Sequence, residues 1–502
     1  MSKNGYLLGY DLGSSFIKAS LISSETGALI ASAASTDTEL TIRSPKAGWA
    51  EQDPSMWWQH IVRATLKLKI KVGNKLKDVK AIGITYQMHG LVIVDKKMNV
   101  LYPSIIWCDS RAVPLGDKAF SVIGKEKCLT HLLNSPGNFT ASKVAWVKKN
   151  VPVVYKKIYK MMLPGDYIAY KLTGEVQTTT TGLSEGILWD FKKQDLADMV
   201  LDYYHIPKHL IPDVVPVFSV QGRVTKEAAE LTGLPPGIPV SYRAGDQPNN
   251  ALSLNVLNPG EIAATAGTSG VVYGVGDKPV YDNKSRVNVF VHVNHTKKKP
   301  RYGTLLCLNG AGIMNSWLKN NLFTINKEIL RYDEIDRLAS QAPIGSQGLC
   351  VLPYGNGAER TLENKNISAS IRGLNLTIHN KTHLARAVQE GVAFAMNYGL
   401  QIMKDMGLTV KVIRTGYANM FLSPLFVSAF ATLTNSVIQL YNTDGAQGAA
   451  RGAGIGAGIY SSPQEAFKHL KIIKTVRPNS SQRDAYRAAY ERWEEYLINS
   501  LL

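Results

Sequence analysis

The chain of 502 residues has few cysteines, and they lack the spacing that cysteine-based sites require. Its four cysteines, Cys108, Cys128, Cys307 and Cys350, are far apart, and no two of them form a Cys-x-x-Cys pair. A disulfide framework or a zinc site is therefore unsupported, because both need cysteines at defined spacing. Such a composition is typical of a reducing compartment, so the cytoplasm is the expected location.

Long hydrophobic runs are also missing from the sequence. No uninterrupted apolar stretch reaches the roughly 18 residues that a membrane-spanning helix needs. Residues 1–5 lead almost at once into a strand-like segment, without the apolar core and the small-residue cleavage site of a secretory signal. We therefore expect neither a signal peptide nor a membrane anchor, and no membrane partner.

Acidic residues are scarce relative to basic ones. The chain has 39 Asp and Glu against 57 Lys and Arg, a net charge of +18. A basic chain can bind nucleic acid, yet these lysines are spread as pairs, for example at 148–149, 156–157 and 192–193. No stretch combines aromatic and basic residues as nucleic-acid sites do. The charge therefore predicts a solvated surface with a mild attraction for an anionic nucleotide, and no nucleic-acid partner.

The length and the strand pattern predict an α/β protein of two related domains. A chain of this length exceeds what one hydrophobic core usually supports. Strands are expected over 6–10, 16–22 and 28–34, and again over 261–266, 271–275, 287–293 and 301–308. Each set contains a short glycine turn, and because Gly13 and Gly267 lie 254 positions apart, we expect a duplicated hairpin domain. The expected domains are 1–250 and 251–502.

Helices are expected between and after the strands. They are predicted behind Asp53-Pro54, over 384–406, over 425–433 behind Ser423-Pro424, over 445–459 and over 486–497. The fourth contains Gly454-x-x-x-Gly458, a spacing known from paired membrane helices. The run between Asp444 and Arg451 is too short for that role, so we expect a helix packed tightly beneath a nucleotide.

Asp11 interrupts an apolar strand and is followed at once by the tight turn Gly13-Ser14-Ser15. Phosphoryl transfer needs a held triphosphate, a cation that neutralises it and an aligned acceptor hydroxyl. Gly13, Ser14 and Ser15 can offer backbone N–H groups and hydroxyls to phosphate, and Lys18 adds positive charge. Asp11 is a candidate ligand for Mg²⁺, directly or through water. The alternative is an Asx-type turn cap.

A second turn and a second acid complete the candidate chemistry. Gly267-Thr268-Ser269-Gly270 repeats the phosphate-sized turn without the carboxylate. Asp246, in Ala244-Gly245-Asp246-Gln247, lies between the two turns and could accept the proton of an acceptor hydroxyl. Its ordinary pKa of about 3.9 would leave it ionised at neutral pH. The alternative for the second glycine turn is an ordinary hairpin. The alternative for Asp246 is a turn aspartate before Pro248.

Two further segments suit a polyol. Tyr86-Gln87-Met88-His89-Gly90 ends an apolar stretch, and there His89 could hydrogen-bond a sugar hydroxyl while Met88 forms an apolar wall. A lone histidine is by itself more often structural. Trp107-Cys108-Asp109-Ser110-Arg111 places an aromatic face beside an acid and a base, so Asp109 and Arg111 are also candidate sugar contacts.

Together these motifs resemble the FGGY carbohydrate kinase family, most closely its xylulokinase branch. The likeness spans about residues 5–460. The motifs taken together in this order are far more specific than any single motif. The matching segments are 11–15, 49–54 with Trp57-Trp58, 87–90, 107–111, 163–167, 172–175, 245–246, 267–270, 352–354 and 359–361.

The resemblance implies a two-lobed actin-like ATPase fold, in which two ribonuclease-H-like domains close over MgATP and sugar. It implies that Met88 and His89 contact a ketose. It implies that Asp246 activates O5 of D-xylulose, giving D-xylulose 5-phosphate in pentose catabolism. Gly310 and Asn419 are expected at the nucleotide.

The sequence departs from the family pattern at two places. Ala418-Asn419-Met420-Phe421 stands where a run of glycines usually borders the adenosine, which leaves the nucleotide preference open. Gln247 follows the expected base, where xylulokinases often have asparagine and the glycerol kinase branch has glutamine, and we expect it to contact the substrate. A kinase for ribulose or glycerol, or a non-catalytic ATP-driven clamp, is the alternative. A homodimer is a further expectation.

Overall fold

The structure is a computed structural model that describes residues 4–325 and 328–502. Its residues divide into two compact units, and neither unit is one continuous stretch of chain. The first unit contains Met1–Asn255, Phe290–Tyr302 and Thr443–Leu470, and the second contains Val256–Val289, Gly303–Asn442 and Lys471–Leu502. This division differs from the expected blocks 1–250 and 251–502, chiefly because residues 443–470 join the first unit.

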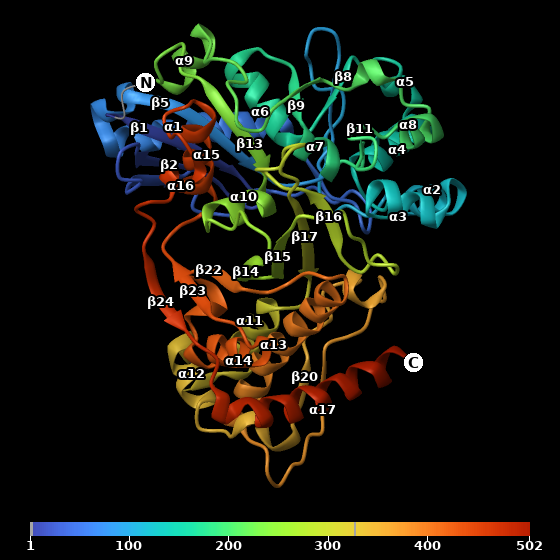
Figure 1. The fold of residues 1–502 in the computed structure, drawn as a ribbon, viewed down its shortest axis with the longest axis vertical. Helices are drawn as coiled ribbons and strands as arrows, with labels where there is room; N and C mark the ends of the chain where they lie inside the picture. The colour runs from blue at the N-terminus through green and yellow to red at the C-terminus, as the bar shows by residue number, and fades with distance from the viewer. Residues whose placement is uncertain (1–3, 326–327) are drawn as a thin grey trace. The chain divides into compact units, whose positions relative to one another are not determined.

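The first unit is built on a five-stranded sheet with the order β13-β5-β1-β2-β3 (Figure 1). Its strands are β1 Tyr6–Leu12, β2 Ile17–Ser23, β3 Leu29–Ala34, β5 Val79–Tyr86 and β13 Val240–Gly245. The first three form the antiparallel meander expected from the sequence, whereas β5 pairs in parallel with both β1 and β13. The carboxyl ends of β1, β5 and β13 therefore lie at one edge of the sheet.

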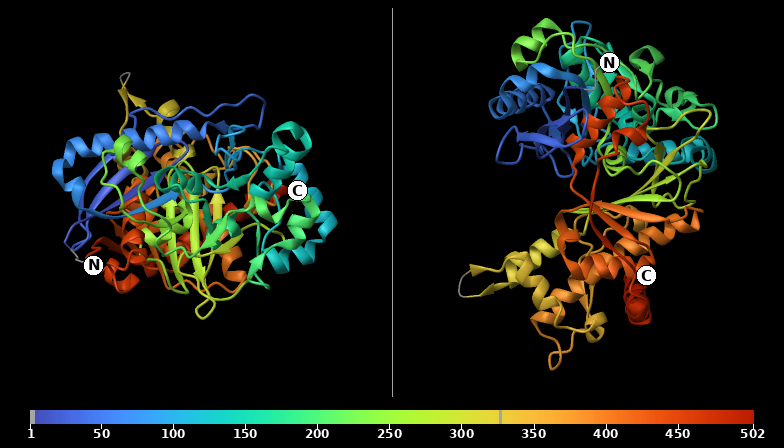
Figure 2. Two further views of the ribbon diagram at one scale, coloured as in Figure 1. Left: turned by 90° about the horizontal axis from the view of Figure 1, so that it is seen from above. Right: turned by 60° about the vertical axis from the view of Figure 1, so that its left-hand side comes forward.

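One face of this sheet is covered by helix α1, Pro54–Val72. Its start is fixed as predicted, because the Asp53 carboxylate accepts a hydrogen bond from the backbone N–H of Ser55 at 2.8 Å. Alternate residues of β1, such as Leu8 and Tyr10, belong to the same buried core as α1. The Tyr10 hydroxyl also hydrogen-bonds Thr65 of α1 at 2.6 Å. Figure 2 shows α1 running along the strands.

Helix α15, Gly445–Gly456, packs on β1, β5 and β13 and belongs to the first unit. The contact is between backbones: a Cβ on Gly9 would lie 1.8 Å from the carbonyl oxygen of Ala446, and one on Gly83 would lie 1.9 Å from that of Ala449. This close contact explains why residues 443–470 do not stay with the second unit. The expected tight packing is confirmed, although the helix ends at Gly456 rather than at residue 459. No helix in the described part of the chain is both long and apolar enough to cross a membrane.

The second unit repeats the strand pairing of the first around a seven-stranded sheet, β16-β17-β15-β14-β22-β23-β24. These strands are β14 Glu261–Ala266, β15 Gly270–Gly276, β16 Asn288–Val291, β17 Tyr302–Leu308, β22 Val412–Gly416, β23 Ile438–Tyr441 and β24 Ile472–Val476. β14 pairs antiparallel with β15 and parallel with β22, as β1 pairs with β2 and β5. The repeated pairing confirms the expected duplication, and with it the α/β class of an actin-like fold built from two ribonuclease-H-like domains.

Three long helices fill the core of the second unit, as the apolar spacing predicted. They are α13 Lys381–Asp405, α14 Pro424–Thr434 and α17 Arg483–Leu501. Trp493 of α17 is fully buried in this core, and its indole N–H donates to the carbonyl oxygen of Val351 at 2.8 Å. This bond anchors the last helix beside β20, Cys350–Leu352.

The backbone contact of α15 predicts a stability effect. Gly83→Ala places a methyl group against the carbonyl of Ala449, so we expect it to lower the free energy of unfolding by about 1–3 kcal/mol. Thermal unfolding measures the loss. Gly276→Ala is the matched control, because there the nearest heavy atom to a new Cβ, from Leu408, would lie 3.6 Å away. Equal melting temperatures for the two variants would contradict the proposed contact.

Candidate active site

The turn between β1 and β2 contains the first predicted phosphate motif. The N–H of Gly13 donates to the carbonyl of Phe16 at 3.0 Å, and Gly13, Ser14 and Ser15 are all partly exposed. The turn is held by a side chain that sequence reasoning missed, because Gln52 donates to the carbonyl oxygen of Ser14 at 2.7 Å.

Gln52 is itself held in place by two buried donors. Its side-chain oxygen accepts hydrogen bonds from the Trp57 indole and from the Gln87 amide, each at 3.0 Å. The Trp107 indole in turn donates to the Ser14 hydroxyl at 3.2 Å. The phosphate-type turn is thus connected to the two segments predicted to hold the sugar.

Asp11 lies near three other charged residues of the first unit, Lys18, Asp246 and Asp444. Its Cα pairs with that of Lys18 across the β1–β2 ladder, so these two oppositely charged residues are direct cross-strand neighbours. Loss of hydration and the nearby carboxylates of Asp444 and Asp246 raise the pKa of Asp11 to about 7, an increase that Lys18 opposes. A Cβ on Gly445 would lie 2.6 Å from an Asp11 carboxylate oxygen. The start of α15 therefore approaches Asp11 as closely as a glycine allows.

Asp444 precedes Gly445 and was not singled out in the sequence as a site residue. Its carboxylate accepts a hydrogen bond from the backbone N–H of Gln447 at 2.9 Å and caps α15. The Asp-Gly pair at residues 444–445 is the sequence signal that could have identified it. The cap explains part of its role, while its charge also acts on Asp11.

Asp246 is the first residue of helix α10, Asp246–Ser253, directly after β13 ends at Gly245. It is therefore a helix residue and not a turn aspartate. Burial raises its pKa to about 6, and hydrogen bonds from Gln247 oppose this increase. The pKa is higher than the ordinary value assumed from the sequence, yet at neutral pH the group is still mostly a carboxylate.

Met88 and His89 follow β5 and lie beside the residues that follow β13. A Cβ on Gly245 would lie only 2.5 Å from Cγ of Met88, so Met88 packs directly on the glycine before Asp246. The fold thus brings Met88 and Asp246 to one sheet edge, although 158 positions separate them in the sequence.

His89 is held in a strained backbone conformation, with φ of 63°. Its Nδ1 hydrogen-bonds the carbonyl oxygen of Glu185 at 2.8 Å, and its own carbonyl accepts from Nζ of Lys143 at 2.8 Å. Its ring packs edge-on against Phe139, with centroids 4.8 Å apart. Burial lowers the pKa of Lys143 to about 7, and Lys143 is another residue that the sequence motifs did not identify.

Asp109 and Arg111, the other predicted sugar contacts, form a buried ion-pair network with Glu51. The Arg111 guanidinium binds the Asp109 carboxylate at 2.7 Å and Glu51 at 2.8 Å, and it stacks over Trp49 at 3.7 Å from the ring centroid. Asp109 is fully buried and also accepts a hydrogen bond from the backbone N–H of Ala50 at 2.5 Å. Because these charges satisfy one another, they fix the loop rather than face solvent. The partner Glu51 could not be recognised from local spacing.

The second predicted phosphate turn, between β14 and β15, lies against the start of helix α11, Gly312–Leu322. The N–H of Ile313 donates to the carbonyl of Thr268 at 3.0 Å. A Cβ on Gly267 would lie 3.3 Å from the side-chain amide nitrogen of Asn419, which itself has a left-handed φ of 55°. Thr268 is exposed and Ser269 partly exposed, so the polar groups of this turn are accessible.

Gly310 is fixed just before α11 by a buried acid. The Glu359 carboxylate accepts the backbone N–H groups of Asn309 at 3.0 Å and Gly310 at 2.9 Å. A Cβ on Gly310 would lie 2.0 Å from the carbonyl oxygen of Pro353. The structure therefore brings Gly267, Thr268 and Asn419 together, with Gly310 anchored at the approach to the same helix.

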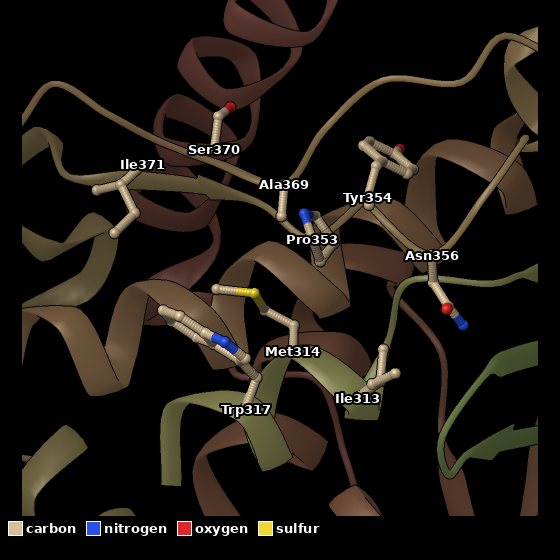
Figure 3. A pocket seen from close by; sticks show the side chains of 10 residues that line it. Ile313, Met314, Trp317, Pro353, Tyr354, Asn356, Ala369, Ser370 and Ile371 are labelled. Carbon is tan, nitrogen blue, oxygen red and sulfur yellow. The ribbon is translucent and has the colours of Figure 1, made fainter. Parts of the chain in front are cut away.

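A cavity of about 500 Å³ opens beside α11, mostly with apolar walls. In Figure 3, Met314 and Trp317 of α11 face Pro353 and Ala369 across it. Trp317 is 48% exposed, unusually high for so large an apolar side chain. Pro353 lines this cavity, and its carbonyl oxygen also packs against Gly310.

Comparisons with known proteins identify the family of the chain. The FGGY family of carbohydrate kinases is matched by its N-terminal domain over residues 6–253 and by its C-terminal domain over residues 262–459. A xylulose kinase of Haemophilus influenzae is 30% identical over 90% of this chain and 91% of that protein. One of Bacillus subtilis is 28% identical over 97% and 96%.

A solved structure described as a xyloylose kinase from Brucella ovis superposes with a TM-score of 0.88, at 25% identity over 99% of this chain and 100% of that one. The chain belongs to the FGGY family of carbohydrate kinases. It is a phosphotransferase with an alcohol group as acceptor.

The expected contact of Gly310 with the nucleotide gives a testable prediction. Glu359→Ala leaves two backbone N–H groups without their acceptor, so we expect the KM for nucleotide to rise about tenfold. Steady-state kinetics with either substrate varied measures this, and the KM for sugar should be unchanged. The exposed ion pair of Glu363 with Lys284 supplies the control, Glu363→Ala, which should alter neither KM. An unchanged nucleotide KM in Glu359→Ala would contradict the anchoring role.

Proposed function

We propose that this chain transfers the γ-phosphoryl group of ATP to O5 of D-xylulose, giving ADP and D-xylulose 5-phosphate. The single observation that carries the proposal is the placement of Asp246 at a helix start, beside Met88 and with His89 at the neighbouring strand end. Relatives named xylulose kinases, matched over almost their whole length, support the choice of sugar.

The residues of the first unit suggest how the transfer proceeds. The acceptor oxygen attacks the γ-phosphorus, the bond from that phosphorus to the β–γ bridging oxygen breaks, and Asp246 takes the hydroxyl proton. Gln247 hydrogen-bonds the Asp246 carboxylate and keeps it oriented. Met88 supplies an apolar wall for the sugar, and His89 supplies the hydrogen bond that fixes a hydroxyl.

Mg²⁺ fits the donors at Asp11. Burial, together with the nearby carboxylates of Asp444 and Asp246, raises the pKa of Asp11 to about 7, and a divalent cation would favour the ionised form by relieving the repulsion among the carboxylates. Among the described residues no three His, Cys, Asp or Glu side chains form a ready-made metal site. Asp11 would therefore hold the ion directly or through water, with phosphate oxygens completing its shell. The ion would neutralise charge on the phosphates.

The two glycine turns and the segments beside them would hold the nucleotide. In the first unit, Gly13, Ser14 and Ser15 offer N–H and hydroxyl donors to phosphate oxygens, near the charge of Lys18. In the second unit the corresponding groups are Gly267, Thr268 and Ser269, with Gly310 and Asn419 contacting the nucleoside. Each set is ordered by the contacts described above.

An ADP-release assay on purified protein with MgATP tests the proposal. It compares D-xylulose, L-xylulose, D-ribulose, L-ribulose, glycerol and no sugar. We expect turnover that strongly favours D-xylulose. A preference for glycerol or ribulose would overturn the sugar assignment and retain the kinase. ATP hydrolysis that no sugar changes would overturn the kinase function in favour of an ATP-driven clamp.

The raised pKa of Asp246 predicts the acid limb of the pH profile. The carboxylate is the active form, so protonation inactivates the base and kcat/KM should fall as pH decreases through about 6. Asp246→Asn should reduce kcat by about 100-fold or more while ATP still binds. Asp213→Asn, an exposed control in the same unit, should keep the wild-type profile. Wild-type-like turnover in Asp246→Asn would rule out its role as the base.

A further inference from the structure

Glu185 is a buried acid that none of the sequence motifs contains as a site residue. It is the last residue of helix α7, Thr180–Glu185, and it is 1% exposed. Neither of its carboxyl oxygens has a hydrogen-bond partner of good geometry, although the buried Tyr86 hydroxyl lies near enough to affect its ionisation. Buried polar groups in this state are rare and call for an explanation.

The position of Glu185 relative to the sugar side of the site suggests that explanation. A Cβ on Gly245 would lie 2.7 Å from Oε2 of Glu185 and 2.5 Å from Cγ of Met88. The carboxyl group therefore packs against the glycine that introduces Asp246. The backbone carbonyl of the same residue accepts the hydrogen bond of the His89 ring at 2.8 Å. Glu185 thus packs close to three predicted site residues, Met88, His89 and Asp246.

The charges around Glu185 favour its protonated form. Burial makes the largest contribution, and the nearby carboxylates of Asp246 and Asp166 add to it, so the pKa of Glu185 lies well above its ordinary value. The charge of Lys143 opposes this increase, but its ammonium group is engaged elsewhere. Lys143 donates to the carbonyl oxygens of His89 and Ile106, and Arg243 pairs with Asp166 at 3.0 Å. The two neighbouring acids therefore differ: the pKa of Glu185 lies well above its ordinary value, whereas that of Asp246 rises only to about 6.

We propose that Glu185 is a positioning residue of the sugar side of the site, an uncharged acid that supports Met88 and the Gly245–Asp246 turn. The inference rests on the sugar kinase function proposed above. Because Glu185 stays protonated, Asp246 remains the one carboxylate beside Met88 that gains a proton during transfer. The isosteric amide of glutamine should replace the neutral acid, whereas alanine should leave a cavity beneath Met88 and Gly245.

The kinetic test uses Glu185→Gln and Glu185→Ala in the full-length protein, with the sugar and MgATP varied separately. We expect Glu185→Ala to raise the KM for D-xylulose about tenfold and to leave the KM for ATP unchanged. Glu185→Gln should keep both constants within about twofold of wild type at pH 7. Asp190→Asn is the matched control, since Asp190 is equally buried and pairs with His131 at 2.9 Å. It should lower the melting temperature without changing either KM.

An infrared difference spectrum tests the charge of Glu185 without any turnover. Wild type minus Glu185→Gln at pH 7 should contain the carbonyl band of a protonated carboxyl group. A carboxylate band in its place would overturn the proposal, even if the wild-type protein proved inactive on every sugar.

The two proposals can fail separately. Wild-type protein that phosphorylates no sugar would overturn the function proposed above, while the infrared band still tests Glu185. An active wild type with an unchanged sugar KM in Glu185→Ala would overturn the positioning role alone. Equal rises in both KM values, together with a lower melting temperature, would show that Glu185 has a purely structural role. That result would also overturn the positioning role.

Discussion

The close backbone contact between helix α15 and the strands β1, β5 and β13 is the constraint on which the site of the first unit depends. Glycines at positions 9 and 83 let the helix reach the strands, and Gly445 lets its first turn reach Asp11. Asn249 of α10 then donates to the carbonyl oxygen of Gly445 at 2.9 Å. Asp11 and Asp246 are thereby placed on elements that are packed against the same helix, an arrangement that keeps side chains well ordered.

This packing concentrates carboxylates in a poorly hydrated region, and the cost is visible in their ionisation. The pKa of Asp11 rises to about 7 and that of Asp246 to about 6, while the pKa of Glu185 lies well above its ordinary value. A site of this kind stores electrostatic energy that a cation can release. The strained backbone of His89 is a second such cost, and the contacts of Lys143 and Glu185 maintain it.

Much of the fold could be predicted because its signals are local. The β1–β2 hairpin, the Asp53 cap of α1 and the apolar spacing of α13 and α17 depend on neighbours a few residues away. The order of short motifs similarly identified the candidate residues. Spacing could not reveal that Arg111 also pairs with Glu51, since that contact spans 60 positions of the chain.

By itself the sequence determined the fold class, the duplicated hairpins and the acids and glycine turns available for phosphoryl transfer. Only the tertiary structure decided which groups act on one another. It placed residues 443–470 in the first unit, linked Gln52 to the turn at residues 13–15 and buried Glu185 beside Gly245, the residue before Asp246. The physical reason is that ionisation and positioning depend on burial and on neighbours distant in the chain. These are set by how helices and strands pack, whereas turns, caps and periodic patterns are set by adjacent residues.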